Sequence, residues 1–174
     1  MNDTDQTLFS EELDAAILAL KDHYPDPHAV VIPALYVVQD AFGYISDEAI
    51  IHVGDLLGVP AAEILGTLTF YTMFRRERSG LFHINVCKNL SCHLTGSRDL
   101  RKHIETSLGI SVGETSADGL FTLGEVECLG ACTESPVIEV DGEYHFRVTP
   151  EKADEILEIY RQRAGAQRPS PGAD

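Results

Sequence analysis

Four cysteines in two close pairs constrain this chain more than any other feature of its sequence. Four residues separate Cys87 from Cys92, and three separate Cys128 from Cys132. The two pairs lie 35 residues apart and account for all the cysteines of the chain. Each pair directly follows a segment predicted to be a strand, so two loops at the same end of a sheet can bring the four thiols to one site. The cysteines therefore predict a metal centre on a domain that contains a sheet.

The type and spacing of these ligands favour one kind of centre. Four thiolates are the ligand set of a [2Fe-2S] cluster. Soft thiolates also bind zinc or Cu(I) in preference to harder metals. Structural zinc sites usually carry C-x2-C pairs, so the longer spacings here favour the larger cluster. Gly96 follows the first pair and Gly130 lies within the second, where a small residue lets the backbone approach the cluster. A zinc-stapled interaction module remains the alternative at this point.

The charge of the chain limits its partners and its location. It has 28 acidic and 13 basic side chains, a formal net charge of −15, which repels nucleic acid and anionic lipid. It lacks the run of about 18 apolar residues that a membrane span needs, and its polar, acidic first residues do not resemble a secretory signal. We therefore expect a cytoplasmic protein, in which the cysteines stay reduced and bind metal rather than form disulfides.

The first part of the chain is predicted to be helical. After a flexible tail of residues 1–9, apolar residues at helical spacing predict a helical bundle over residues 10–78. Its second helix is expected to begin near Val30, with Pro33 tolerated in the first turn. An aromatic segment, 66–74, is expected to pack in the core rather than to serve as a partner surface. The charged residues that follow are expected to form a solvated linker.

The second part, residues 79–163, shows a different pattern. Alternating apolar residues predict a strand over 82–87, and the order that follows is helix, strand, strand, strand, helix. Asp141-Gly142 is a hairpin turn signal between the last two strands. The order predicts an α+β protein whose second domain is thioredoxin-like, with one helix on each face of a four-stranded sheet. Residues 164–174 are expected to form a flexible tail.

Other chemistry finds little support in the sequence. Neither a G-x-G-x-x-G string nor a Walker A string is present, so we expect nucleotides to bind a partner instead. His93 is expected to be a loop residue beside Cys92, because a Rieske centre would use two histidines. Glu127 is expected to be a solvated carboxylate at a strand end. Lys88 and Arg98 are the cations nearest to the cysteines in sequence. We predict no catalytic acid, base or nucleophile.

Six strings of the sequence resemble one known family. They are Ile32-Pro33-Ala34-Leu35, Gly43-Tyr44-Ile45-Ser46, Thr69-Phe70-Tyr71-Thr72-Met73-Phe74, Val86-Cys87-Lys88-Asn89-Leu90-Ser91-Cys92, Asp118-Gly119-Leu120-Phe121-Thr122-Leu123 and Val126-Glu127-Cys128-Leu129-Gly130-Ala131-Cys132. Together they resemble the E-type [2Fe-2S] subunit of the NADH:quinone oxidoreductase, respiratory complex I, over roughly residues 10–163. Related subunits serve NAD-dependent hydrogenases and formate dehydrogenases, which are alternative parents for this chain.

The resemblance implies a fold, a cofactor and a partner. The fold would be a helical bundle followed by a thioredoxin-like ferredoxin domain. One [2Fe-2S] cluster would be held by Cys87, Cys92, Cys128 and Cys132, with no catalytic residues. FMN and NADH would bind the F-type partner of the same complex, with which the cluster exchanges one electron, so this chain alone would not oxidise NADH. The protein would be peripheral to the cytoplasmic membrane through its complex, and the isolated chain could form a homodimer.

Overall fold

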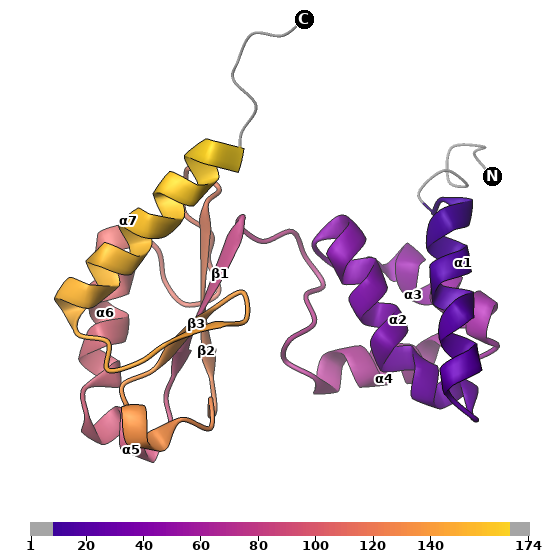
Figure 1. The fold of residues 1–174 in the computed structure, drawn as a ribbon, viewed down its shortest axis with the longest axis horizontal. Coiled ribbons are helices and arrows are strands. Elements are labelled where there is room, and N and C mark those ends of the chain that lie inside the picture. The colour runs from indigo at the N-terminus through magenta and orange to yellow at the C-terminus, as the bar shows by residue number, and fades with distance from the viewer. Residues whose placement is uncertain (1–8, 168–174) are drawn as a thin grey trace, which may run out of the picture. The chain divides into compact units, whose positions relative to one another are not determined.

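The computed structural model describes residues 9–167, which form two compact units divided between Arg78 and Ser79 (Figure 1). The first unit contains α1 (Glu11–Ala19), a 3-10 turn η1 (Leu20–His23), α2 (Pro27–Phe42), α3 (Asp47–Leu57) and α4 (Ala61–Phe70). The second contains β1 (Phe82–Cys87), α5 (Leu90–Leu94), α6 (Ser97–Leu108), β2 (Phe121–Val126), a 3-10 turn η2 (Cys132–Glu134), β3 (Ile138–Val140), β4 (Glu143–His145) and α7 (Pro150–Gln167). The predicted α+β class is confirmed. None of the helices within residues 9–167 has the length and apolar content needed to cross a membrane.

The helices α1, α2 and α3 of the first unit begin at side-chain caps. The N–H of Ala49 donates to the Ser46 hydroxyl at the start of α3, at 3.2 Å. At the start of α2, the N–H of His28 donates to the Asp26 carboxylate at 2.9 Å. The prediction that α2 begins near Val30 is therefore wrong. Asp26 followed by a proline is a helix start, because the carboxylate caps the free N–H groups and proline needs none at the first position.

The core of the first unit includes one residue that was assigned to the N-terminal tail. Phe9 lies with its ring centroid 5.3 Å from that of Phe42 and 4.1 Å from that of His52. Residues 1–8, the rest of the predicted tail, lie outside the described residues.

The apolar faces of the helices bury a common set of side chains: Ile17, Val30, Val31, Ala34, Leu35, Val38, Ile45, Ala49, Ile50, Val53, Leu57, Val59, Ile64, Leu68 and Phe74.

The aromatic segment at the end of α4 is only partly in this core. Phe74 is buried and lies edge-to-face with Tyr36. Phe70, in contrast, is 78% exposed at the last position of α4. The chain turns after Tyr71, whose carbonyl accepts from the N–H of Phe74 at 3.2 Å, so the turn directs Phe74 inward. The prediction of core packing is right for Phe74 and wrong for Phe70.

The charged segment after α4 is bound to the helical unit. The N–H of Arg75 donates to the side-chain oxygen of Gln39 at 2.7 Å. Arg76 forms an ion pair with Asp47, and the Arg78 guanidinium lies 5.6 Å from the centre of the Tyr44 ring. Arg76 and Arg78 are exposed, as expected for a solvated segment, but both contact side chains of the helical unit.

The second unit is built on a four-stranded sheet in the order β2-β1-β3-β4. β1 runs parallel to β2, with Cys87 opposite Val126, and antiparallel to β3. β3 and β4 form the hairpin that the Asp141-Gly142 signal predicted. Because β1 and β2 are parallel, the loops that follow them leave the sheet at the same edge.

Both long helices of this unit cover one face of the sheet (Figure 1). Leu100 and Ile104 of α6 share a buried cluster with Ile156 and Leu157 of α7 and with the inward side chains of the strands. The prediction of one helix on each face is wrong. Successive side chains of a strand point to opposite faces of the sheet. The face away from the two helices carries polar residues, among them Asn85, whose side-chain amide donates to the Glu139 carboxylate at 2.7 Å.

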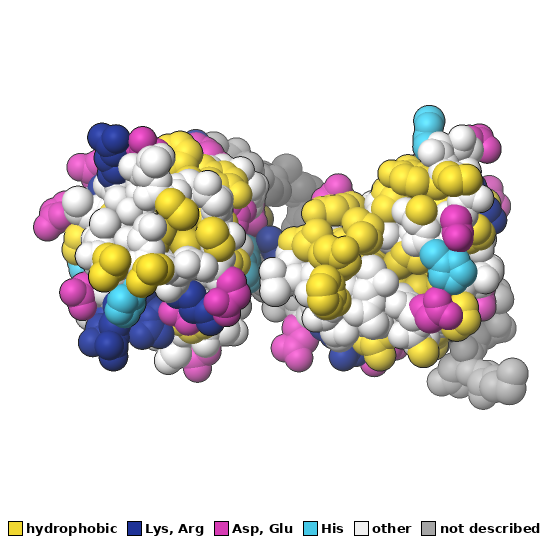
Figure 2. All heavy atoms as spheres, turned by 90° about the horizontal axis from the view of Figure 1, so that it is seen from below, with side chains coloured by type: hydrophobic (Ala, Val, Ile, Leu, Met, Phe, Trp, Pro, Cys, Tyr) yellow, Lys and Arg dark blue, Asp and Glu magenta, His cyan; other side chains and the backbone are white. Residues whose placement is uncertain are grey.

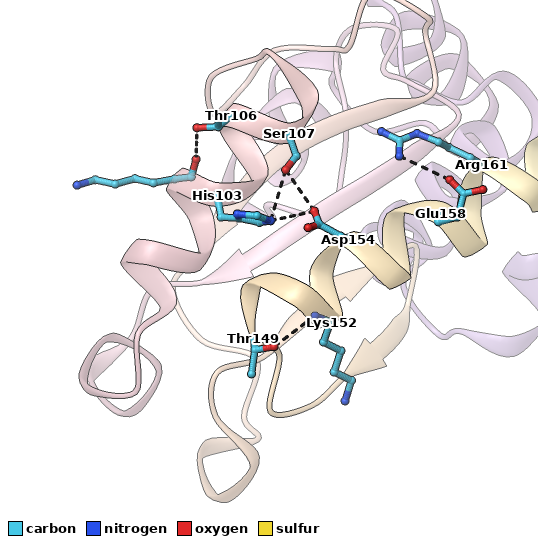
Figure 3. A network of polar contacts seen from close by, with 9 residues as sticks. His103, Thr106, Ser107, Thr149, Lys152, Asp154, Glu158 and Arg161 are labelled. Carbon is cyan, nitrogen blue, oxygen red and sulfur yellow. Dashed lines mark hydrogen bonds and ion pairs between the residues drawn. The ribbon is translucent and has the colours of Figure 1, made fainter.

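Polar contacts join α6 to α7 where they lie side by side (Figure 3). The ring nitrogen Nε2 of His103 lies 2.8 Å from an Asp154 carboxylate oxygen, and the Ser107 hydroxyl donates to the same oxygen at 3.2 Å. Ser107 lies 3.4 Å from that same ring nitrogen. A catalytic triad needs its serine and its acid on different nitrogens of the histidine, so this group joins two helices and is not a catalytic site.

The last helix extends further than predicted. α7 continues to Gln167, and Ala164 is buried in the core cluster. The prediction of a flexible tail from residue 164 is therefore wrong for residues 164–167. Residues 168–174 lie outside the described residues.

A partly buried histidine makes the stability of the second unit depend on pH. Burial lowers the pKa of His145, opposed by Glu143 and assisted by Lys152 and Arg163. Below about pH 6.5, His145 binds a proton more readily in the unfolded chain than in the folded protein. The free energy of unfolding should therefore have its full value above this pH and decrease as the pH falls. Thermal unfolding between about pH 7.5 and pH 5.5 should show a smaller decrease for His145→Gln than for the wild type. The control is His23→Gln in the first unit, and equal slopes for wild type and His145→Gln would contradict the prediction.

Candidate metal centre

The four cysteines lie on the loops that leave one edge of the sheet. Cys87 is the last residue of β1, and Cys128 follows β2 after one residue. The N–H of Lys88 donates to the Val126 carbonyl at 3.1 Å, so the two parallel strands stay paired up to the point where these loops begin. Cys92 lies in α5 and Cys132 begins η2. The fold therefore carries both pairs to the same end of the second unit.

The short helix α5 was not predicted from the sequence. Its five residues are too few to show an apolar period, although the side chain of Asn89 caps it by accepting from the N–H of Leu90 at 2.7 Å. Thr95 donates to the Ser91 carbonyl at 2.9 Å at the other end. His93, predicted to be a loop residue, is part of this helix. The helix buries Cys92, which is 2% exposed.

The thiols differ in burial and are all free. Cys87 and Cys92 are buried, whereas Cys128 and Cys132 are exposed, and none forms a disulfide. The Cys92 thiol is hydrogen-bonded to Cys87 and is close enough to Cys132 to interact with its charge. Burial, helped by the hydrogen bond to Cys87, raises the pKa of Cys92 to about 11. A metal that binds here must displace the proton of Cys92.

Backbone N–H groups point at two of the sulfurs. The N–H of Gly130 donates to the Cys128 sulfur at 3.3 Å. Gly130 has a φ of +72°, a conformation that glycine adopts without strain. The N–H of Val137 hydrogen-bonds the Cys92 sulfur and lowers its pKa, although less than burial raises it. Such bonds stabilise negative charge on a thiolate ligand.

The structure brings some of the predicted ligands into direct contact. Cys87 and Cys92 form a small buried cluster with Val137, against which Leu129 and Ala131 of the second cysteine loop pack. Cys132 is near Cys92, and Cys128 lies next to Leu129 in the same loop. Among residues 9–167, no three Cys, His, Asp or Glu side chains gather closely enough to hold a single metal ion. The fit to a [2Fe-2S] cluster therefore rests on four unpaired thiols from two adjoining loops and on two N–H groups directed at sulfur.

The nearest cation to these cysteines is already paired. Lys88 lies 2.8 Å from the Glu127 carboxylate. Glu127 was expected to be a solvated carboxylate, and it is 83% exposed but takes part in this pair. The hydrogen bond to Glu127 raises the pKa of Lys88. Arg98, the other cation singled out in the sequence, lies on α6 and has no acidic partner among the described residues.

Comparisons with known proteins cover most of the chain. A family model described as thioredoxin-like [2Fe-2S] ferredoxin matches residues 17–161. The chain is 42% identical over 151 residues to the NADH-quinone oxidoreductase E-type subunit numbered 2 of Rhizobium meliloti (strain 1021), covering 87% of this chain and 88% of the relative. It is 38% identical over 157 residues to the NADH-quinone oxidoreductase E-type subunit of Pseudomonas aeruginosa, covering 90% and 95%.

A solved structure shares the fold. The NAD⁺-reducing [NiFe]-hydrogenase in its air-oxidised state superposes with a TM-score of 0.67 at 20% sequence identity. The match covers 80% of this chain and 24% of the hydrogenase chain. The arrangement of elements described above therefore occurs inside a larger redox protein.

Proposed function

Because this chain belongs to the thioredoxin-like [2Fe-2S] ferredoxin family and to the E-type subunits of NADH-quinone oxidoreductases, we propose that it is an electron-transfer subunit of such an oxidoreductase. One [2Fe-2S] cluster is its cofactor, and it exchanges single electrons with the FMN of a partner protein in the complex. The observation that carries the proposal is the meeting of two cysteine loops at one edge of the sheet, where Cys92 is hydrogen-bonded to Cys87 of the first loop and lies near Cys132 of the second.

Each cysteine loop has a part in this function. Cys87, Cys92, Cys128 and Cys132 hold the cluster, which accepts and releases one electron at a time when bound. The N–H groups of Gly130 and Val137 donate to ligand sulfurs and so stabilise their negative charge. The buried position of Cys87 and Cys92 shields that side of the site from water.

The remaining parts of the reaction belong to partners. An F-type partner carries FMN and binds NADH. This assignment agrees with the absence of a G-x-G-x-x-G string and a Walker A string from this sequence. This chain by itself does not oxidise NADH, and it is held at the cytoplasmic membrane through the complex. Its domains are a helical bundle that ends at Arg78 and a ferredoxin domain that begins at Ser79 and includes α7 up to Gln167.

Spectroscopy of the purified chain tests this function. We expect a brown-red protein with iron and acid-labile sulfide in the proportion of one [2Fe-2S] cluster per chain. Reduction by dithionite should bleach the visible absorption and produce a spin-half EPR signal. A colourless protein that contains one zinc would instead support the interaction module. A colourless protein without metal would be reconstituted with iron and sulfide anaerobically, and failure to take up a cluster would contradict the proposal.

A second parent complex is favoured by one observation. The shared fold with an NAD⁺-reducing [NiFe]-hydrogenase extends over 80% of this chain. In that case the same cluster would serve hydrogen-linked reduction of NAD⁺. Purification of the native complex distinguishes the two parents. A quinone oxidoreductase couples NADH oxidation to quinone reduction, whereas an NAD⁺-reducing hydrogenase couples hydrogen oxidation to NAD⁺ reduction.

A further inference from the structure

A pocket of about 320 Å³ lies in the second unit between the first cysteine loop and the start of α6. Figure 2 looks onto the end of this unit where α5 lies and shows Lys and Arg side chains gathered beside a histidine. Three of the residues that line the pocket are cations and one is an acid, in a chain whose net charge is −15. The lining residues are Val86, Lys88, His93, Ser97, Arg98, Arg101 and Glu125.

Ser97 presents an unused hydroxyl to this pocket. The residue is only 3% exposed, and its hydroxyl has no hydrogen-bond partner within residues 9–167. Every fully buried side-chain polar atom in the described part of the chain has a partner. The Ser97 hydroxyl is therefore accessible, and the pocket is the space that this residue lines. A ligand in the pocket can accept a hydrogen bond from it without displacing a protein partner.

The start of α6 adds backbone donors at the same place. The N-cap is Gly96, which has no side chain to accept from the first N–H groups of the helix. The N–H groups of Asp99 and Leu100 donate to the Gly96 carbonyl at 3.1 and 3.0 Å. Those of Ser97 and Arg98 have no acceptor among the residues that the structure describes. Free N–H groups and the positive end of a twelve-residue helix favour an anion.

The cations of the pocket differ in their availability. Arg101 lies 3.3 Å from Glu125 and 3.6 Å from Glu105, and Lys88 is paired with Glu127. These acids reduce the positive charge that a ligand would meet. Arg98 is exposed and has no such partner among residues 9–167, so its guanidinium can form charge-assisted hydrogen bonds with a ligand.

We propose that this pocket binds a tetrahedral oxyanion of the phosphate class. The Ser97 hydroxyl, the N–H groups of Ser97 and Arg98, and the Arg98 guanidinium are its donors. A carboxylate of a partner protein could use the same donors, but it presents fewer acceptor oxygens to this many converging groups. The proposal is independent of the electron-transfer function, since it needs no cluster and no flavin.

Calorimetric titration with inorganic phosphate, at constant ionic strength and with the full oxidised chain, tests the proposal. We expect saturable binding of about one phosphate per chain. Arg98→Gln should weaken it about tenfold, and Ser97→Ala about fivefold. Arg98 is exposed, so its replacement leaves the fold intact. The control is Lys21→Gln, which removes the same charge from the exposed turn η1 of the first unit and should leave binding unchanged.

Three results would overturn the proposal. The first is the absence of saturable phosphate binding to the wild-type chain. The second is an equal affinity in wild type and Arg98→Gln. The third is displacement of phosphate by an equal concentration of acetate, which would assign the site to a protein carboxylate.

Discussion

Replacing Cys92 by alanine should leave the purified protein with about a tenth or less of the wild-type cluster content. Cys92 is the most enclosed of the four thiols and the one with contacts to both loops, through Cys87 in the first and Cys132 in the second. Without its sulfur, one iron would have three rather than four sulfur ligands, counting the bridging sulfides. Iron and sulfide analysis, together with visible absorption, measures the loss.

Matched variants separate ligation from a general disturbance of the loop. Thr133→Ala changes an exposed residue next to Cys132 and should keep the full cluster content. Cys87→Ala, Cys128→Ala and Cys132→Ala should each behave like Cys92→Ala. A Cys128→Ala protein that keeps a normal spectrum would show that the exposed thiol is not a ligand. Far-UV circular dichroism checks that each variant is folded.

Phe121→Ala should destabilise the second unit by about 3–5 kcal/mol, because it removes a large side chain from a packed core. Phe121 is 0% exposed in β2, and its ring lies 6.0 Å from that of Phe82 on the neighbouring strand. The Arg161 guanidinium of α7 lies 5.7 Å from the same ring. Alanine would leave a cavity where β2, β1 and α7 meet.

Urea unfolding followed by circular dichroism and by visible absorption measures this effect. The cluster should be lost at a lower urea concentration in Phe121→Ala, because β2 leads directly into the loop of Cys128. Leu81→Ala is the control, since Leu81 is 49% exposed just before β1 and should change the free energy of unfolding by about 0.5 kcal/mol or less. Equal midpoints for the two variants would contradict the assignment of Phe121 to the core.

Local patterns in the sequence were sufficient for most elements. The alternation of apolar residues over 82–87 predicted β1, and Asp141-Gly142 predicted the hairpin of β3 and β4. The family and its one [2Fe-2S] cluster were predicted from strings around the cysteines and are confirmed by the family comparison. These predictions succeeded because each depends on residues that are neighbours in the chain.

Predictions failed where two local signals competed or where a segment was too short. The second helix was predicted to begin near Val30, but Asp26 followed by Pro27 is the signal that begins it. α5 has only five residues, fewer than an apolar period requires. Phe70 and Phe74 have the same character in sequence, and only the turn between them decides which one is buried.

Local sequence patterns were enough to predict four thiols as a ligand set, the α+β order of elements and a division of the chain near residue 78. Four thiols in two pairs, a change from helical to alternating periodicity and a charged segment between them are all local properties. The packing of α6 and α7 on one face of the sheet, and the pocket beside α6, became visible in the folded protein and not in the sequence. Six of the seven residues that line the pocket lie within residues 86–101, but they come from β1, the loop after it, α5 and α6, and the seventh, Glu125, comes from β2. Such a site depends on which strands are paired and which face a helix covers, and long-range packing sets both.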